Sequence, residues 1–248
     1  IMIFGETRTK VANRHALIAP DGHVPSQLPG ISGAVVNVLI SPALGANLTQ
    51  LLLAFADNNG RAEFAAEDVE TCAYIMEGGC VATIGDESEP LDKGGYVFAP
   101  AGKKLELSRP AAGTKATIFQ KYYEELEGIP GPAPVFGNAR NVEGQPFLGD
   151  PDARLKVLLP DTPSFDMAVN LFTYQPGARL PFVETHIMEH GLIMLEGEGV
   201  YRLEDAWYPV TVGDAIWMAP WCPQWFVAMG KGPASYLYYK DINRSPMA

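Results

Sequence analysis

The sequence repeats itself at a fixed spacing of 119 residues, the distance from Glu77 to Glu196, and this repeat limits the possible folds more than any other feature. Several identities occur in one register without a gap, and short apolar runs align with them throughout. The identities are Glu77-Gly78 with Glu196-Gly197, Glu70 with Glu189, Val81 with Val200, Pro90 with Pro209, Gly94 with Gly213, and Lys121 with Lys240. Chance does not explain so many matches in one register. The repeat predicts an internal duplication of one structural module.

Both copies have the composition of β structure. Short apolar runs alternate with clusters of Gly, Pro and Asp, and no stretch has a helical period long enough to compete. The 25 glycines and 21 prolines favour many short strands joined by tight turns. In the second copy the apolar runs are 167–174, 191–195, 199–203, 215–219 and 236–240. We therefore predict an all-β protein.

Two segments of different composition flank and separate the modules. Residues 1–30 mix charges, prolines and two histidines, and we interpret them as an N-terminal arm. Residues 126–149 begin with a Gly- and Pro-rich run that resists both helix and strand, and we interpret them as a linker. The predicted modules are then residues 31–125 and 150–248.

Charge and cysteine content argue against several classes of protein. The formal net charge of −11 at pH 7 repels phosphate backbones, so we expect no nucleic-acid partner. No apolar run approaches the roughly 18 residues that would predict a membrane helix, so we expect no membrane partner. Three cysteines without a CxxC pair argue against a disulfide framework and a cysteine zinc site. We expect a protein of the reducing cytoplasm.

Two of the four histidines lie in the segment 184–190, which carries the candidate chemistry. Glu184 and His186 are two residues apart, so on a strand they would point to one face, and His190 keeps the same parity. Two imidazoles and a carboxylate on one inward face form a ligand set for a divalent transition metal. The alternative is a set of inert, hydrogen-bonded polar residues at a strand end.

The residues that follow resemble the cupin superfamily. Gly197 lies seven residues after His190, and Gln224 lies eleven residues after Gly213, spacings that match the two cupin motifs. Glu184 stands where cupins usually have a first histidine, His190 where they have a carboxylate, and Gln224 where they have a last histidine. The resemblance implies a bicupin, with two tandem double-stranded β-helix (cupin) barrels. The implied metal ligands are Glu184, His186, His190 and Gln224.

That permuted ligand pattern resembles the (S)-ureidoglycine aminohydrolase family. The resemblance is densest over 177–244 and includes Gly-Val-Tyr-Arg-Leu at 199–203 and Tyr-Leu-Tyr-Tyr-Lys-Asp-Ile-Asn-Arg at 236–244. It implies a manganese ion, or another divalent first-row metal, in the C-terminal barrel. It also implies conversion of (S)-ureidoglycine to (S)-ureidoglycolate and ammonia during allantoin and purine degradation. The expected partners are a small ureido substrate and further copies of the chain in a homo-oligomer.

The resemblance further assigns roles to individual residues. Lys240 and Glu184 are the implied catalytic residues. The implied substrate-binding residues are Tyr201, Tyr236, Lys240, Glu184 and Gln224. Tyr236, Tyr238 and Lys240 alternate on one predicted strand, so all three share a face. Lys240 recurs as Lys121 in the first copy, which leaves open that both lysines merely end a strand and pair with acids.

The first copy lacks the ligand set. Its residues at the positions of Glu184, His186, His190 and Gln224 are Ala65, Glu67, Thr71 and Leu105. No such set binds a metal, so we expect this module to serve packing and assembly.

Two other functions stay open from the sequence. Two histidines and a carboxylate also serve iron dioxygenases of the cupin type, although Gln224 argues mildly against that activity. A metal-bearing cupin that binds a ligand without turnover is the other alternative, because one fold supports many functions.

Overall fold

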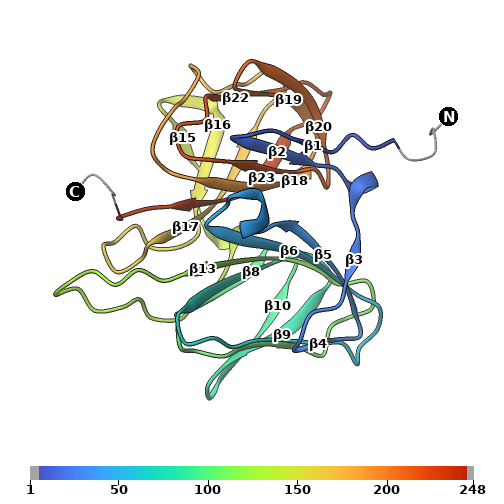
Figure 1. The fold of residues 1–248 in the computed structure, drawn as a ribbon, viewed down its shortest axis with the longest axis vertical. Coiled ribbons are helices and arrows are strands. Elements are labelled where there is room, and N and C mark those ends of the chain that lie inside the picture. The colour runs from blue at the N-terminus through green and yellow to red at the C-terminus, as the bar shows by residue number, and fades with distance from the viewer. Residues whose placement is uncertain (1–5, 245–248) are drawn as a thin grey trace. The chain divides into compact units, whose positions relative to one another are not determined.

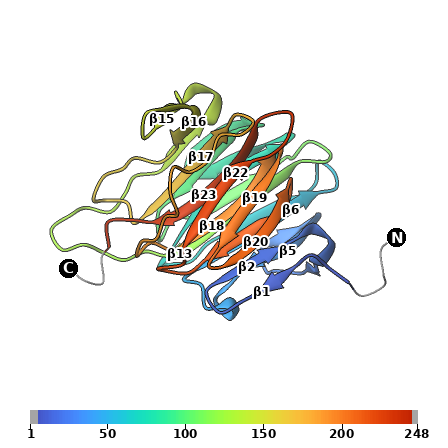
Figure 2. The same cartoon turned by 90° about the horizontal axis from the view of Figure 1, so that it is seen from above.

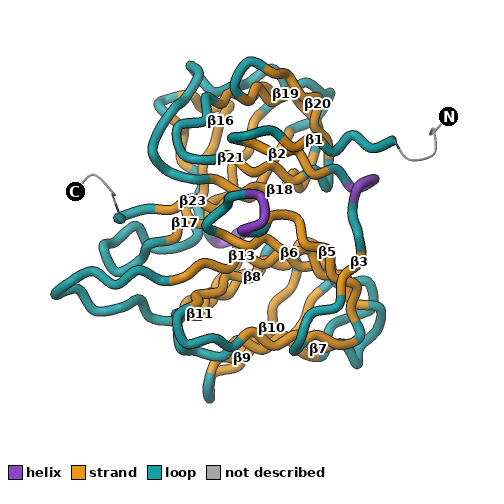
Figure 3. The backbone as a smooth tube through the Cα atoms, in the orientation of Figure 1, coloured by secondary structure: helices purple, strands orange, loops and turns teal. Residues whose placement is uncertain are grey.

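The computed structural model describes residues 6–244, and these residues form strands and turns almost throughout (Figure 1). The only helical segments in that range are short 3-10 turns, which Figure 3 distinguishes from the strands. They are η1 (Pro20–Gly22), η2 (Pro42–Leu44) and η3 (Ala139–Asn141). Within residues 6–244 no helix is a candidate for spanning a membrane. The all-β prediction is confirmed.

The chain forms two compact units that interleave along the sequence. Unit 1 contains residues 6–23, Gly144–Lys156 and Asn170–Asp241. Unit 2 contains Val24–Glu143, Val157–Val169 and residues 242–244. The predicted arm 1–30 contributes two strands to a sheet of unit 1 and one strand to a sheet of unit 2. The predicted linker 126–149 contains strands as well as turns.

Unit 1 contains two sheets, and Figure 2 shows several of their strands side by side. The larger sheet has the order β1-β2-β21-β18-β23-β17-β16-β15, and the smaller has the order β20-β19-β22. The bounds in the larger sheet are β1 (Lys10–Val11), β2 (His15–Ile18), β15 (Gln145–Phe147), β16 (Asp150–Val157), β17 (Met167–Tyr174), β18 (His190–Glu196), β21 (Ala215–Met218) and β23 (Ala234–Asp241). Those in the smaller sheet are β19 (Glu198–Leu203), β20 (Ala206–Thr211) and β22 (Gln224–Ala228).

Unit 2 also contains two sheets, with the orders β14-β11-β8-β13-β6-β5-β3 and β10-β9-β12-β7-β4. The bounds in the first are β3 (Pro25–Ser26), β5 (Ala34–Ile40), β6 (Leu48–Phe55), β8 (Val69–Glu77), β11 (Gly95–Ala99), β13 (Lys115–Tyr122) and β14 (Val135–Asn138). Those in the second are β4 (Ile31–Ser32), β7 (Arg61–Phe64), β9 (Gly79–Ile84), β10 (Glu87–Asp92) and β12 (Leu105–Ser108). The sheets of both units are open rather than closed into rings.

The strand bounds reproduce the internal repeat. A shift of 119 residues carries β6 onto β17, β9 onto β19, β10 onto β20 and β13 onto β23, with the same first and last residue in each pair. The repeated Glu-Gly turns have one physical cause. Gly78 and Gly197 have φ of +73° and +71°, and a Cβ on Gly197 would lie 2.2 Å from the carbonyl oxygen of Pro233. Only glycine satisfies both demands.

The core of unit 1 lies between its two sheets and is rich in aromatic rings. Phe172 and Tyr174 stack with centroids 4.3 Å apart, and Phe226 and Tyr236 pack edge to face with centroids 5.5 Å apart. Strand alternation explains why these rings lie together, because residues two apart on a strand point to the same face. One part of this aromatic core opens into the cavity described next.

Candidate active site

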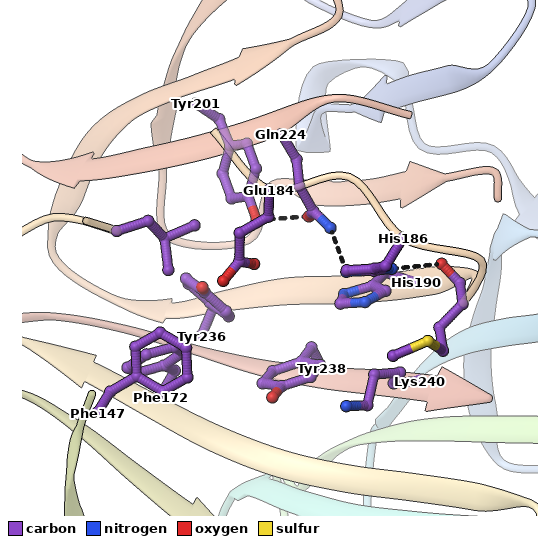
Figure 4. A pocket seen from close by; sticks show the side chains of 12 residues that line it. Phe147, Phe172, Glu184, His186, His190, Tyr201, Gln224, Tyr236, Tyr238 and Lys240 are labelled. Carbon is purple, nitrogen blue, oxygen red and sulfur yellow. Dashed lines mark hydrogen bonds between the residues drawn. The ribbon is translucent and has the colours of Figure 1, made fainter. Parts of the chain in front are cut away.

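A cavity in unit 1 contains the side chain of every site residue predicted from the sequence (Figure 4). Its lining combines titratable groups with aromatic rings. The lining residues are Phe147, Phe172, Leu180, Glu184, His186, Met188, His190, Tyr201, Gln224, Tyr236, Tyr238 and Lys240. The predicted face of β23 is confirmed, because Tyr236, Tyr238 and Lys240 all reach the cavity.

Two antiparallel backbone hydrogen bonds join the segment of Glu184 to the start of β22. The amide of Glu184 donates to the carbonyl of Gln224 at 2.8 Å, and the amide of Gln224 donates back to the carbonyl of Glu184 at 2.9 Å. Residues 185–189 are irregular, and β18 begins only at His190. The strand parity assumed for 184–190 is therefore wrong for the middle of this segment, although the loop still brings His186 to the cavity.

His186 lies between Gln224 and a backbone carbonyl. Its Nδ1 is 3.2 Å from the carbonyl oxygen of Met188, so this nitrogen carries the hydrogen and donates it. The lone pair is then on Nε2, which lies 3.0 Å from Nε2 of Gln224. A carbonyl that accepts a hydrogen bond from one ring nitrogen leaves the lone pair on the other nitrogen, which is the arrangement of metal-binding histidines.

His190 lies between two rings. It stacks on His186 with centroids 4.7 Å apart, and on the other side it stacks on Tyr238 with centroids 5.4 Å apart and planes 2° apart. Its Nε2 is buried and has no hydrogen-bond partner among the residues that the structure describes. A buried nitrogen without a partner is costly unless a ligand contacts it.

Burial sets the charge of these groups. Burial lowers the pKa of His186, and the positive charge of Lys240 adds to the effect. Burial, then His186, then Lys240 lower the pKa of His190 well below its ordinary value. Both imidazoles are therefore neutral at neutral pH, with lone pairs available. Burial raises the pKa of Glu184, and Lys240 opposes that rise.

The donor chemistry of His186, His190 and Gln224 fits a divalent first-row metal. Neutral imidazoles and an amide oxygen are suitable ligands, and the buried Nε2 of His190 lacks any other partner. In Figure 4 the carboxylate of Glu184 points to the side of the cavity where Tyr236 lies. Across residues 6–244 no three His, Cys, Asp or Glu side chains are grouped closely enough to hold a metal by themselves. Glu184 as a fourth ligand stays a prediction.

Lys240 and its repeat Lys121 have different surroundings. The Nζ of Lys121 lies 2.5 Å from Oδ2 of the buried Asp166 in unit 2. Lys240 pairs with His190 across β23 and β18, and its Nζ forms no ion pair with any described residue. Pairing with an acid at a strand end thus describes Lys121 and not Lys240.

The equivalent positions in unit 2 do not form a site. Leu105 is buried in the apolar core, and Thr71 accepts a hydrogen bond from Nε2 of Gln120 at 3.2 Å. Ala65 and Glu67 are exposed. These residues offer no converging donors, as the sequence comparison of the two copies predicted.

Sequence reasoning did not find four of the lining residues. Phe172 carried a usable signal, because it alternates with Tyr174 along a predicted strand. Leu180 and Met188 lie in irregular segments without a period. Phe147 falls in the predicted linker, where composition gave no indication of a site.

The chain is similar to proteins of known family. Residues 170–239 match the family model described as Cupin domain. The (S)-ureidoglycine aminohydrolase of Arabidopsis thaliana is 35% identical over 246 residues, covering 98% of this chain and 80% of the relative. The (S)-ureidoglycine aminohydrolase of Escherichia coli K12 is 34% identical over 232 residues, covering 92% and 88%.

A solved structure agrees with these relatives. The crystal structure of the E. coli protein Ylba superposes with a TM-score of 0.86 at 32% sequence identity, and the match covers 96% of each chain. Similarity at this level extends over both units, so it confirms the predicted bicupin architecture as well as the resemblance noted in the C-terminal half. This chain belongs to the (S)-ureidoglycine aminohydrolase family.

Proposed function

We propose that this protein is a manganese-dependent enzyme that converts (S)-ureidoglycine and water to (S)-ureidoglycolate and ammonia. One observation carries the proposal. The cavity of a chain from this family places the ammonium of Lys240 and the phenols of Tyr201 and Tyr236 around two neutral imidazoles. These groups match a substrate that carries a carboxylate, a ureido group and an amine on one carbon.

Lys240 is suited to hold the substrate carboxylate. Its ammonium has no acidic partner within ion-pair distance in residues 6–244, and the cavity around it is partly desolvated, which strengthens a charge-assisted contact. Lys240 thereby fixes one of the three substituents of the reacting carbon.

The two phenols are suited to hold the ureido group. The hydroxyl of Tyr201 donates to Oε1 of Gln224 at 3.4 Å, and burial raises the pKa of Tyr201 well above its ordinary value. Burial likewise raises the pKa of Tyr236. Both side chains therefore remain neutral phenols that can form hydrogen bonds to the ureido group. Fixing two substituents of a tetrahedral carbon leaves one enantiomer with its amine in the reactive position.

The reaction breaks one C–N bond and forms one C–O bond at that carbon. The departing amine takes up a proton, and water gives up a proton as its oxygen bonds to carbon. Glu184 lines the cavity, and its raised pKa suits a carboxyl group that exchanges protons, so we assign it the transfer to the amine.

His186, His190 and Gln224 would hold the metal, with Glu184 as the fourth ligand. A bound Mn²⁺ would supply Lewis-acid chemistry at the reacting groups. Neutral imidazoles need not lose a proton to bind a metal ion, so binding at His186 and His190 carries no free-energy cost of deprotonation.

The test is ammonia release from (S)-ureidoglycine by the purified protein, with added Mn²⁺ and after treatment with a chelator. Aminals also lose ammonia spontaneously, so the enantiomeric composition of the ureidoglycolate is measured in the same samples. We expect Mn²⁺-dependent ammonia release and an excess of the (S) product. Ammonia release at the background rate with a racemic product would contradict the proposal, and so would consumption of O₂ in step with turnover.

A further inference from the structure

Tyr174 lies behind the cavity and contacts two of its lining residues, Phe172 and Tyr236. The side chain of Tyr174 is not part of the cavity lining, whereas that of Tyr236 is. The hydroxyl oxygens of the two residues lie 2.9 Å apart. We propose that Tyr174 is a positioning residue, which orients the hydroxyl of Tyr236 toward the ureido group of the substrate. This inference rests on the function proposed above and adds to it the residue that controls one substrate contact.

Both tyrosines of this hydroxyl pair are buried, so each hydroxyl needs a partner inside the protein. Tyr174 is 0% exposed and Tyr236 is 4% exposed. The ring of Tyr174 is enclosed by Phe172, with centroids 4.3 Å apart, and by Phe226, with centroids 5.0 Å apart. Neither neighbour offers a hydrogen-bonding group, and a buried hydroxyl without a partner is strongly unfavourable. The contact with Tyr236 satisfies the hydroxyl of Tyr174.

The internal repeat separates the role of the ring from the role of the hydroxyl. Phe55 ends β6 at the position where Tyr174 ends β17, and it is 2% exposed in the core of unit 2. An aromatic ring therefore fills this core position in both units. The hydroxyl occurs only in the unit that contains the predicted ligand set, where Tyr236 stands in place of Thr117. Packing explains the ring at this position but not its oxygen.

The geometry of a phenol explains how the hydroxyl acts. A tyrosine hydroxyl has one hydrogen to donate and lone pairs to accept, and it rotates unless a partner holds it. The contact with Tyr174 uses one of these hydrogen-bonding positions on the hydroxyl of Tyr236. Burial raises the pKa of both phenols well above the ordinary value, so both keep their hydrogens. The contact with Tyr174 therefore restricts the rotation of the hydroxyl of Tyr236, a residue that lines the cavity.

The experiment is a double-mutant cycle of Tyr174→Phe, Tyr236→Phe and the double variant, with kcat and KM measured for (S)-ureidoglycine on the metal-loaded protein. Loss of one oriented hydrogen bond corresponds to a factor of about ten. We expect Tyr174→Phe to raise KM about tenfold with little change in kcat, because the contact holds substrate before and during reaction. In the Tyr236→Phe background the same substitution should have no further effect on KM.

Controls separate positioning from packing. Tyr208→Phe removes another hydroxyl of unit 1, which lies 2.9 Å from Nε2 of His15, outside the cavity lining, and it should leave KM unchanged. An unchanged KM in Tyr174→Phe would overturn the inference, as would an equal loss in both backgrounds. If the wild-type protein releases no ammonia above background, the proposed function fails and this inference fails with it. If the wild-type protein is active and the Tyr174→Phe variant has the same KM, only the inference fails.

Discussion

Lys240 lies directly opposite His190 in the pairing of β23 with β18, and both side chains reach the same cavity. Burial lowers the pKa of both imidazoles, and the positive charge of Lys240, which this pairing brings close to them, adds to the effect. The equivalent strand of unit 2, β13, has Lys121 at the repeated position, and Lys121 instead forms an ion pair with Asp166. One duplicated position thus holds a structural ion pair in one unit and a candidate substrate contact in the other.

Lys240→Met should abolish ammonia release while the metal content of the protein stays normal, because Lys240 is assigned to the substrate and not to the metal. The measurement is elemental analysis combined with turnover. The matched control is Lys121→Met, which leaves Asp166 buried and unpaired. It should retain activity and lose about 3 kcal/mol of unfolding free energy, the typical cost of breaking a buried ion pair. Near-normal turnover by Lys240→Met would return this lysine to a structural role.

His186→Ala and His190→Ala should each abolish metal binding and turnover while preserving the fold, because the two imidazoles supply adjacent lone pairs. Metal affinity is measured by titration, and folding is checked by circular dichroism. Glu67→Ala changes the position equivalent to His186 in unit 2, where the side chain is exposed, and it should leave metal content unchanged. Normal metal content in both histidine variants would contradict the assigned site.

Glu70 should make the protein less stable as pH rises. Burial and then the neighbouring Asp166 raise the pKa of Glu70 to about 9, against an unfolded value of about 4.3. The folded state therefore binds a proton that the unfolded state has lost. The stability contributed by this proton is complete below about pH 4.3 and is lost progressively as pH rises to about 9.

Glu70→Gln keeps a neutral group at this position, so it should reduce the fall in unfolding free energy between pH 5 and pH 9, the interval chosen for the denaturant titrations. The exposed Glu89→Gln is the control and should follow the wild-type profile. Parallel profiles for Glu70→Gln and wild type would show that Glu70 is ionised in the folded protein.

Gly197→Ala should destabilise unit 1 more than Gly177→Ala does. Both glycines have positive φ, so both substitutions incur a backbone cost of about 1–2 kcal/mol. Only at Gly197 would the new Cβ also lie 2.2 Å from the carbonyl oxygen of Pro233, because Gly177 has no atom within 4 Å of the added carbon. Thermal and denaturant unfolding measure the difference, and equal losses would rule out close packing as the reason for glycine in this turn.

Most of the fold could be predicted because the repeat and the strand period support each other. The apolar run 167–174 coincides with β17, and 199–203 lies within β19. The pairing of β2 with β21 could not be predicted, because a strand of four residues has no readable period and its partner lies far along the chain. Long-range pairing depends on the packed sheet rather than on local propensity.

Some features of the cavity could likewise be predicted from the sequence, and others could not. The alternation of residues on one strand predicts that Tyr236 and Lys240 share a face. The spacing of the cupin motifs predicts the four expected metal ligands. The direction of the Glu184 side chain does not follow from spacing, because residues 185–189 are irregular and hydrogen bonds to Gln224 and Trp221 determine the course of the loop. Tyr174 is recognisable only when the structure shows its hydroxyl against that of Tyr236.

The most direct test of the account is the rate of ammonia release from (S)-ureidoglycine measured as Mn²⁺ is titrated into metal-free protein. A single site in unit 1 predicts that activity rises in proportion to bound metal and reaches its maximum at one ion per chain. Full activity in the metal-free protein, or a maximum that requires a second ion per chain, would contradict it.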